Sequence, residues 1–101
     1  MKKVINGRLY DTDTAKIIDS FNNGLPCTDY SYFSETLYQK RTNEFFVYGH
    51  GGAASHYREC RENGVTGGEV ITPLSVDEAK KWVENNSTAE IYEKLFGKAD
   101  E

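Results

Sequence analysis

The chain has 101 residues and a formal net charge of −4, with an isoelectric point near 5.2. A chain of this length buries roughly 60–70% of its unfolded surface, so we expect a single domain over residues 1–101 that needs no disulfide bonds or metal ions for stability. Residues 1–50 carry six basic and six acidic side chains, whereas residues 51–101 carry six basic and ten acidic ones. This balance argues against direct nucleic-acid binding, which relies on basic patches, and favours a basic partner or no charged partner at all.

The N-terminal quarter predicts a hairpin followed by a helix. Residues 2–5 and 8–10 are short strand candidates, and Asn6-Gly7 between them is the strongest two-residue hairpin turn signal. Four residues then recur at the i, i+3, i+4, i+7 spacing of an amphipathic helix: Thr14, Ile17, Ile18 and Phe21. Gly24 is suited to a left-handed helix cap. We expect this N-terminal helix to lie against the sheet.

Residues 29–50 predict one long β-hairpin around which the sheet is built. They hold seven of the thirteen aromatic residues, and aromatic side chains favour pleated, half-buried surfaces. The polar residues 40–43 suit a four-residue loop between the two strands. The returning strand over residues 44–50 has large apolar groups on both faces, as a central strand does. Because side chains alternate across a strand, Phe33 and Leu37 should share the face that the N-terminal helix covers.

The opposite face of the first strand is phenolic, because Tyr30, Tyr32 and Tyr38 alternate onto it. Three interpretations compete. The C-terminal helices pack over these rings, the rings form a protein interface, or they stack on unpaired bases. The interface interpretation predicts that Tyr30 and Tyr38 are partly exposed in the free protein.

A glycine-rich region over residues 49–68 holds six of the nine glycines and both histidines. Alternation over residues 55–60 permits a short strand, although the flanking glycines leave it poorly determined. A connection this long is usually functional or mobile. Residues 69–72 then predict a strand that Pro73 stops.

The C-terminal third predicts two helices. Residues 75–78 and 87–90 both have the Ser-x-x-Glu spacing of a capping box, so the helices should begin near Val76 and Thr88. Each helix has an apolar stripe, and Gly97 is placed to end the second. Antiparallel strands followed by segregated helices are typical of the α+β class. We therefore expect an antiparallel sheet built on the long central hairpin, with one N-terminal helix and two C-terminal helices.

Three segments carry a resemblance to a known family: MKKVINGRLYDTDTAK at residues 1–16, FSETLYQKRTNEFFVYGHGG at 33–52 and ITPLSVDEAKKWVENN at 71–86. They resemble a family of proteins of about this length that is found on bacterial mobile elements. Members or close relatives of that family include anti-CRISPR inhibitors of type II-A Cas9. The resemblance covers nearly the whole chain and implies a protein that binds Cas9 in the bacterial host cell and blocks engagement of guide RNA or target DNA. It implies no catalytic residues.

The leading hypothesis is therefore a non-enzymatic inhibitor that binds a large, basic nucleic-acid-handling protein such as Cas9. Electrostatic complementarity speeds such encounters, and several acidic side chains of the C-terminal helices are spaced to face outward, although a solvated helix face is the simpler interpretation. The predicted binding residues are Tyr30, Tyr32, Tyr38, Glu84, Glu90 and Glu93. A different interpretation is an interaction module of a mobile element without a CRISPR role.

The second hypothesis is a small nuclease that acts on guide RNA. His50 and His56 flank the glycines, and paired histidines can perform general acid–base cleavage of a phosphodiester, with Arg58 stabilising the developing charge. Catalysis requires that these side chains converge on one point. Two histidines are an ordinary number for this length, so a polar loop and strand end is the simpler interpretation.

Metal, anion and membrane sites are weakly indicated. A zinc set of Cys27, His50, His56 and Cys60 lacks the closely spaced ligand pairs of structural zinc sites, so we expect no metal, no cofactor and two reduced thiols. Residues 49–52 suit a nest of N–H groups for an anion, yet lack the Lys-Ser/Thr ending of a phosphate loop. No apolar run reaches the ~20 residues of a membrane span and no signal peptide is recognisable, so we expect a cytoplasmic protein.

Overall fold

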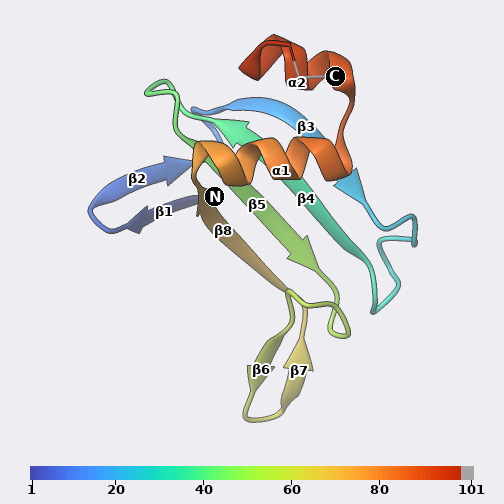
Figure 1. Ribbon diagram of the computed structural model, residues 1–101. Helices are drawn as coiled ribbons and strands as arrows, with labels where there is room; N and C mark the ends of the chain where they lie inside the picture. The colour runs from blue at the N-terminus through green and yellow to red at the C-terminus, as the bar shows by residue number, and fades with distance from the viewer. Residues whose placement is uncertain (99–101) are drawn as a thin grey trace.

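The computed structural model describes residues 1–98. Its main sheet has four strands in the order β3-β4-β5-β8, and every neighbouring pair is antiparallel. The strands are β3 (Lys16–Asn22), β4 (Phe33–Gln39), β5 (Phe45–Gly51) and β8 (Gly68–Leu74). Two helices, α1 (Val76–Asn86) and α2 (Ala89–Phe96), cover one face of this sheet (Figure 1). The α+β class with antiparallel strands and two C-terminal helices is thus confirmed.

Two small hairpins complete the fold. The first pairs β1 (Lys2–Ile5) with β2 (Arg8–Asp11) through the expected Asn6-Gly7 turn, in which both residues have positive φ, 53° and 78°. The second pairs β6 (Glu59–Arg61) with β7 (Gly64–Thr66) and projects from the body at one end of the sheet (Figure 1). We call the β6–β7 hairpin the arm.

The larger core lies between the sheet and α1. Leu37, Phe45 and Val47 pack against Ala79, Trp82 and Val83, and all six side chains are buried. Partly buried apolar side chains of α2, among them Tyr92 and Phe96, extend this core. The apolar stripe of each helix therefore covers the sheet, as expected for amphipathic helices.

A smaller core lies on the opposite face of the sheet, beneath the β1–β2 hairpin. Tyr38 stacks on Phe46 with ring centroids 5.0 Å apart, and Tyr10 meets Phe46 edge-on at 5.5 Å. Ile71 completes this buried cluster. The hairpin covers only one end of the face, so the end that carries Tyr48 and His50 stays more open.

The predicted N-terminal helix is wrong, because its residues form strand β3 at one edge of the sheet. A β-bulge explains the misleading spacing. Ile17 pairs with Tyr38 and Asp19 pairs with Leu37, so Ile18 is an extra residue between the two pairs. This shift puts Ile18 and Phe21 together on the helix-covered face, a three-residue spacing that imitates helical periodicity. The face of Phe33 and Leu37 is covered by the C-terminal helices instead.

The central hairpin is shorter than predicted. Strand β4 begins at Phe33, and residues 29–32 form a turn in which the backbone N–H of Ser31 donates to Oδ1 of Asp29 at 2.8 Å. Strand β5 is an inner strand, as expected, and Asn43 in the preceding loop has a positive φ of 70°. Tyr30 and Tyr32 therefore lie outside the strand whose alternation was used to place them.

The glycine-rich region also departs from expectation. Residues 55–58 are turn rather than strand, and β6 begins only at Glu59. Gly49 is required for packing, because a Cβ there would lie 2.1 Å from the ring of Tyr57. Strand β8 continues past Pro73 to Leu74, since β8 is an edge strand where a residue without an N–H is tolerated.

The ends of the two helices show one correct and one wrong cap. Ser75 and Glu78 form the predicted capping box, with reciprocal bonds of 3.1 and 3.0 Å. Ser87 is instead the C-cap of α1, and Thr88 caps α2 by accepting from the N–H of Ile91. Gly97 ends α2 with a φ of 85°, as predicted. Within residues 1–98 neither helix is long and apolar enough to cross a membrane.

Candidate functional site

The junction between α1 and α2 forms a groove of about 250 Å³, which we call the interhelical groove. Its lining residues are Val83, Glu84, Ser87, Thr88, Ala89, Tyr92 and Glu93. Val83 is buried and Tyr92 is half-buried, whereas Glu84 and Glu93 are exposed. The groove therefore combines an apolar interior with one carboxylate from each helix, and no basic side chain lines it.

The groove exists because the chain turns sharply between the two helices. Ser87 ends α1 and its hydroxyl donates to Asp19 of β3, which fixes the end of the helix over the sheet. Thr88 then caps the next helix immediately. This short connection brings Glu84 and Glu93 to the same groove although they are nine positions apart. The predicted binding residue Glu90 is also exposed, but it does not line the groove.

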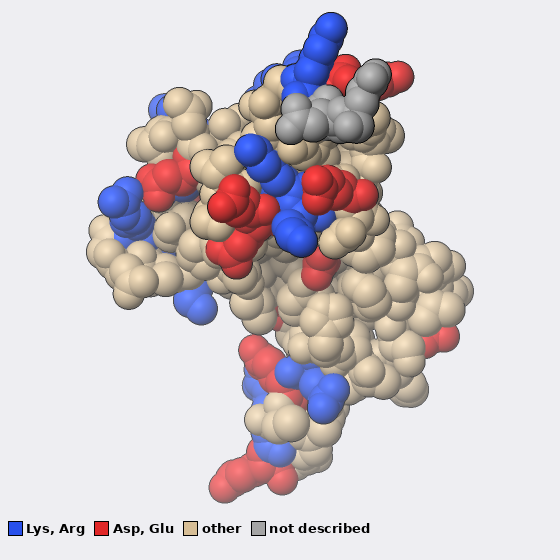
Figure 2. Space-filling model, viewed as in Figure 1, with Lys and Arg blue, Asp and Glu red and all other residues tan. Residues whose placement is uncertain are grey.

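The surface around α1 carries mixed charges rather than one acidic face. Figure 2 shows lysine and acidic side chains side by side over this helix, which contains Asp77, Glu78, Lys80, Lys81 and Glu84. This view shows no broad acidic patch. The groove itself is lined by two carboxylates and no basic side chain.

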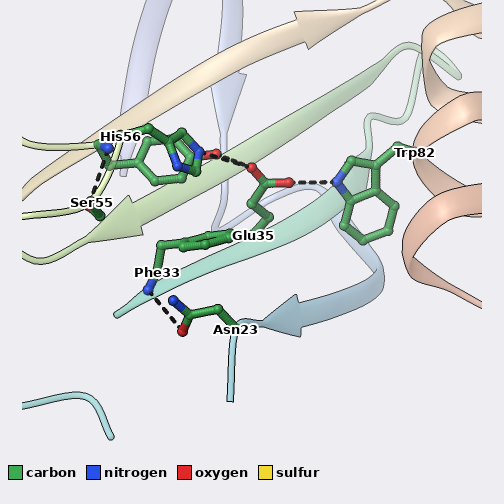
Figure 3. Close-up of polar contacts among 7 residues, drawn as sticks. Asn23, Phe33, Glu35, Ser55, His56 and Trp82 are labelled. Carbon is green, nitrogen blue, oxygen red and sulfur yellow. Dashed lines mark hydrogen bonds and ion pairs between the residues drawn. The ribbon is translucent and has the colours of Figure 1, made fainter. Parts of the chain in front are cut away.

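A second polar cluster is centred on Glu35, beneath the edge of α1 (Figure 3). The carboxylate accepts a hydrogen bond from Nε1 of Trp82 at 3.0 Å and another from the hydroxyl of Tyr57. His56 Nε2 lies 3.7 Å from the same carboxylate. Burial, and then the hydrogen bond and charge of Glu35, raise the pKa of Tyr57 above its ordinary value of 10.0. Glu35 thus ties together the sheet, α1 and the turn that leads into the arm.

The histidines proposed for catalysis are not brought together. His56 lies on the helix-covered face, where its ring meets Phe33 at 4.7 Å. His50 lies on the open face, with its ring 5.7 Å from that of Tyr48. Arg58 uses a guanidinium nitrogen to donate to the backbone carbonyl of Ser55 at 3.3 Å. The sheet separates the two imidazoles, so they do not form an acid–base pair.

The predicted zinc ligands are equally scattered. Cys27, in the loop between β3 and β4, and Cys60, in strand β6, are exposed free thiols. Among residues 1–98 no group of three or more histidine, cysteine or acidic side chains is arranged to hold a metal ion. The described part of the chain gives no support for the zinc interpretation.

The three predicted tyrosines have different environments. Tyr38 is 8% exposed and belongs to the smaller core, contrary to the partial exposure expected of an interface residue. Tyr30 is 75% exposed in the turn before β4. Tyr32 is half-buried, with its ring 5.9 Å from that of His50. Only Tyr30 and Tyr32 are therefore accessible from outside.

Sequence reasoning missed a cleft of about 480 Å³ between the open face of the sheet and the arm, which we call the polar cleft. Its lining residues are Tyr48, His50, Gly51, Glu59, Arg61, Gly67, Gly68 and Glu69. Glu69 pairs with His50 across strands, and its carboxylate accepts from the hydroxyl of Tyr48. In the sequence, the only local sign of this cleft is the glycine content of residues 49–68. The cleft itself depends on the pairing of β5 with β8, which lie at the two ends of that region.

Comparison with known proteins gives no match: no family model, no curated protein and no solved structure is similar to this chain.

Proposed function

We propose that this protein is a non-enzymatic inhibitor that binds a large, basic nucleic-acid-handling protein and blocks access of its RNA or DNA. The resemblance of three sequence segments suggests that the partner is type II-A Cas9. The observation that carries the proposal is the interhelical groove, in which the predicted binding residues Glu84 and Glu93 converge beside Tyr92.

The groove suits a basic side chain that an extended or loop segment of the partner inserts. Its apolar interior accommodates the aliphatic stem of lysine or arginine, and the two carboxylates meet the charged end. Exposed ion pairs contribute only about 0–1 kcal/mol each. We therefore assign most of the affinity to apolar burial against Ala89 and Tyr92, and assign to the charges the speed and orientation of association.

The separation of His50 and His56 supports the non-enzymatic part of the proposal. General acid–base cleavage needs both groups within hydrogen-bond reach of one phosphodiester. His56 is engaged with Glu35 and Phe33 on the helix-covered face, and His50 stands beside Tyr48 on the other. The protein is thus proposed to act by occupying a surface of its partner.

Charge reversal within α2 provides a matched test. We expect Glu93→Lys to slow association with Cas9 about tenfold at low salt and to flatten its salt dependence, because Glu93 lines the groove. Glu90→Lys makes the same change in charge on the same helix outside the groove, and should slow association less. Biolayer interferometry with Cas9, with and without guide RNA, gives the rates, and thermal unfolding should be nearly unchanged for both variants.

Three outcomes would contradict the proposal. Absence of binding to Cas9 in both forms would reject the partner, and equal slowing by the two variants would reject the groove. Cleavage of guide RNA by the wild-type protein that His50→Ala or His56→Ala abolishes would restore the nuclease hypothesis. Intact guide RNA after incubation with excess protein, alone and with Cas9, is the result we expect.

A further inference from the structure

The polar cleft lies on the opposite side of the sheet from the larger core and has no part in the proposed contact at the interhelical groove. One wall is the inner face of the arm, which presents Glu59 and Arg61. The floor is the open end of the sheet, where Tyr48 and His50 follow Phe46 on the same face of β5. A cleft of about 480 Å³ offers room for a side chain together with part of its backbone.

Two aromatic rings, those of Tyr48 and His50, lie on this floor with centroids 5.7 Å apart. The ring of Tyr32, which does not line the cleft, lies 5.9 Å from that of His50. All three side chains are partly exposed. Such faces attract planar groups, and the two candidates are a nucleobase and the guanidinium of arginine.

The charges of the cleft decide between these two. Arg61 is paired with Glu59 at 2.9 Å, so its charge is balanced locally. Glu69 takes part in none of the ion pairs found within residues 1–98. Its carboxylate accepts a hydrogen bond from the hydroxyl of Tyr48. Burial, and second this hydrogen bond, raise the pKa of Tyr48 to about 12. The cleft therefore keeps one unbalanced negative charge, which repels phosphates and attracts a cation.

We propose that the polar cleft binds the guanidinium group of an arginine carried by a protein partner, stacked on the rings of Tyr48 and His50 and paired with Glu69. Arginine fits better than lysine, because a planar guanidinium both stacks on aromatic faces and forms directed hydrogen bonds to a carboxylate. The inference rests on the cleft alone and holds whichever protein supplies the arginine.

The test uses isotope-labelled full-length protein and small probes, without Cas9. N-acetyl-arginine methylamide should shift the backbone amide signals of His50, Gly67 and Gly68 saturably, with a dissociation constant in the millimolar range expected for a single side chain. The citrulline analogue has the same shape without the charge. It should bind about tenfold more weakly, because it lacks both the ion pair and the cation–π contact.

Variants of the protein test whether the Glu69 carboxylate is the group that binds the guanidinium. Glu69→Gln keeps an oxygen that accepts from Tyr48 but removes the carboxylate charge, and should weaken arginine binding about fivefold. Glu62→Gln makes the same change at the exposed tip of the arm, outside the lining of the cleft, and should leave binding unchanged.

Several results would overturn the assignment. Equal binding of the arginine and citrulline probes would show that charge is not read, and equal effects of the two variants would remove Glu69 from the site. Saturable shifts of the same signals by an oligouridylate at lower concentration would assign the cleft to nucleobases. Absence of saturable shifts with arginine would exclude a binding site there.

Discussion

The two small hairpins are both antiparallel pairs of short strands, yet they relate to the body of the protein in opposite ways. The β1–β2 hairpin buries Tyr10 to 5% exposure against Tyr38 and Phe46. It is also joined to the loop after β4 by an ion pair of 3.0 Å between Arg8 and Glu44. Every strand residue of the arm is exposed, and the arm stands away from the sheet (Figures 1 and 2).

This difference shows how little is needed to dock a hairpin. An isolated two-stranded hairpin is at best marginally stable in water, and the buried ring of Tyr10 with the partly buried side chain of Ile5 joins β1–β2 to the smaller core. The arm is held only at its base. There, a Cβ on Gly68 would lie 2.3 Å from the carbonyl oxygen of Tyr57, and Tyr57 in turn donates to Glu35. We infer that β1–β2 contributes to stability and that the arm contributes to binding.

Truncation of Tyr10 gives the largest expected effect. Tyr10→Ala removes a buried ring that packs on Phe46, and should lower the free energy of unfolding by about 3–5 kcal/mol. Val65→Ala removes an apolar side chain from the arm, where Val65 is 50% exposed, and should cost less than about 0.5 kcal/mol. Chemical denaturation of the two variants measures both values. Similar losses would mean that the arm is docked as firmly as β1–β2.

Removal of Glu35 should loosen the base of the arm. Glu35→Ala leaves the indole N–H of Trp82 and the hydroxyl of Tyr57 without their acceptor, at a cost of about 1–3 kcal/mol. Hydrogen exchange should then quicken over residues 52–68 and not over β1–β2. Glu44→Ala is the matched control at the other hairpin. It removes the surface ion pairs with Arg8 and Lys40 and the acceptor of the Thr42 hydroxyl, and should cost much less stability than Glu35→Ala.

Alkaline pH gives the smallest expected effect at the base of the arm, where it acts through Tyr57. The pKa of Tyr57 is raised above its ordinary value of 10.0, chiefly by burial, so the folded protein holds this proton more tightly than the unfolded chain. The resulting stabilisation is complete below pH 10 and is lost as the pH rises through the folded pKa. Burial likewise raises the pKa of Tyr48 to about 12, so its contribution to stability is lost as the pH rises toward that value.

Tyr57→Phe isolates the part of this loss that belongs to the base of the arm. The variant cannot ionise at position 57, so its stability should fall less steeply above pH 10 than that of the wild type. Denaturation at a series of alkaline pH values measures the slopes. Identical slopes would show that the pKa of Tyr57 is the same in the folded protein and in the unfolded chain.

The candidate sites were only partly predictable. Glu84 and Glu93 were expected to face outward, and both are exposed. Their meeting beside Tyr92 depends on the sharp turn at Ser87, which the sequence pattern had assigned to the wrong cap. The burial of Tyr38 depends on Tyr10, twenty-eight positions earlier, which no local pattern connects with it.

The sequence by itself determined the features that a few neighbouring residues control. The Asn6-Gly7 turn, the capping box of Ser75 and the end of α2 at Gly97 follow from local sterics and side-chain hydrogen bonds. Tertiary structure decided the rest. Residues 16–22 have the spacing of a helix, but they become a strand because β4 offers backbone partners and a bulge turns Ile18 toward the helices. The polar cleft likewise forms only when β5 and β8 pair across the arm, since its residues are far apart until that long-range contact is made.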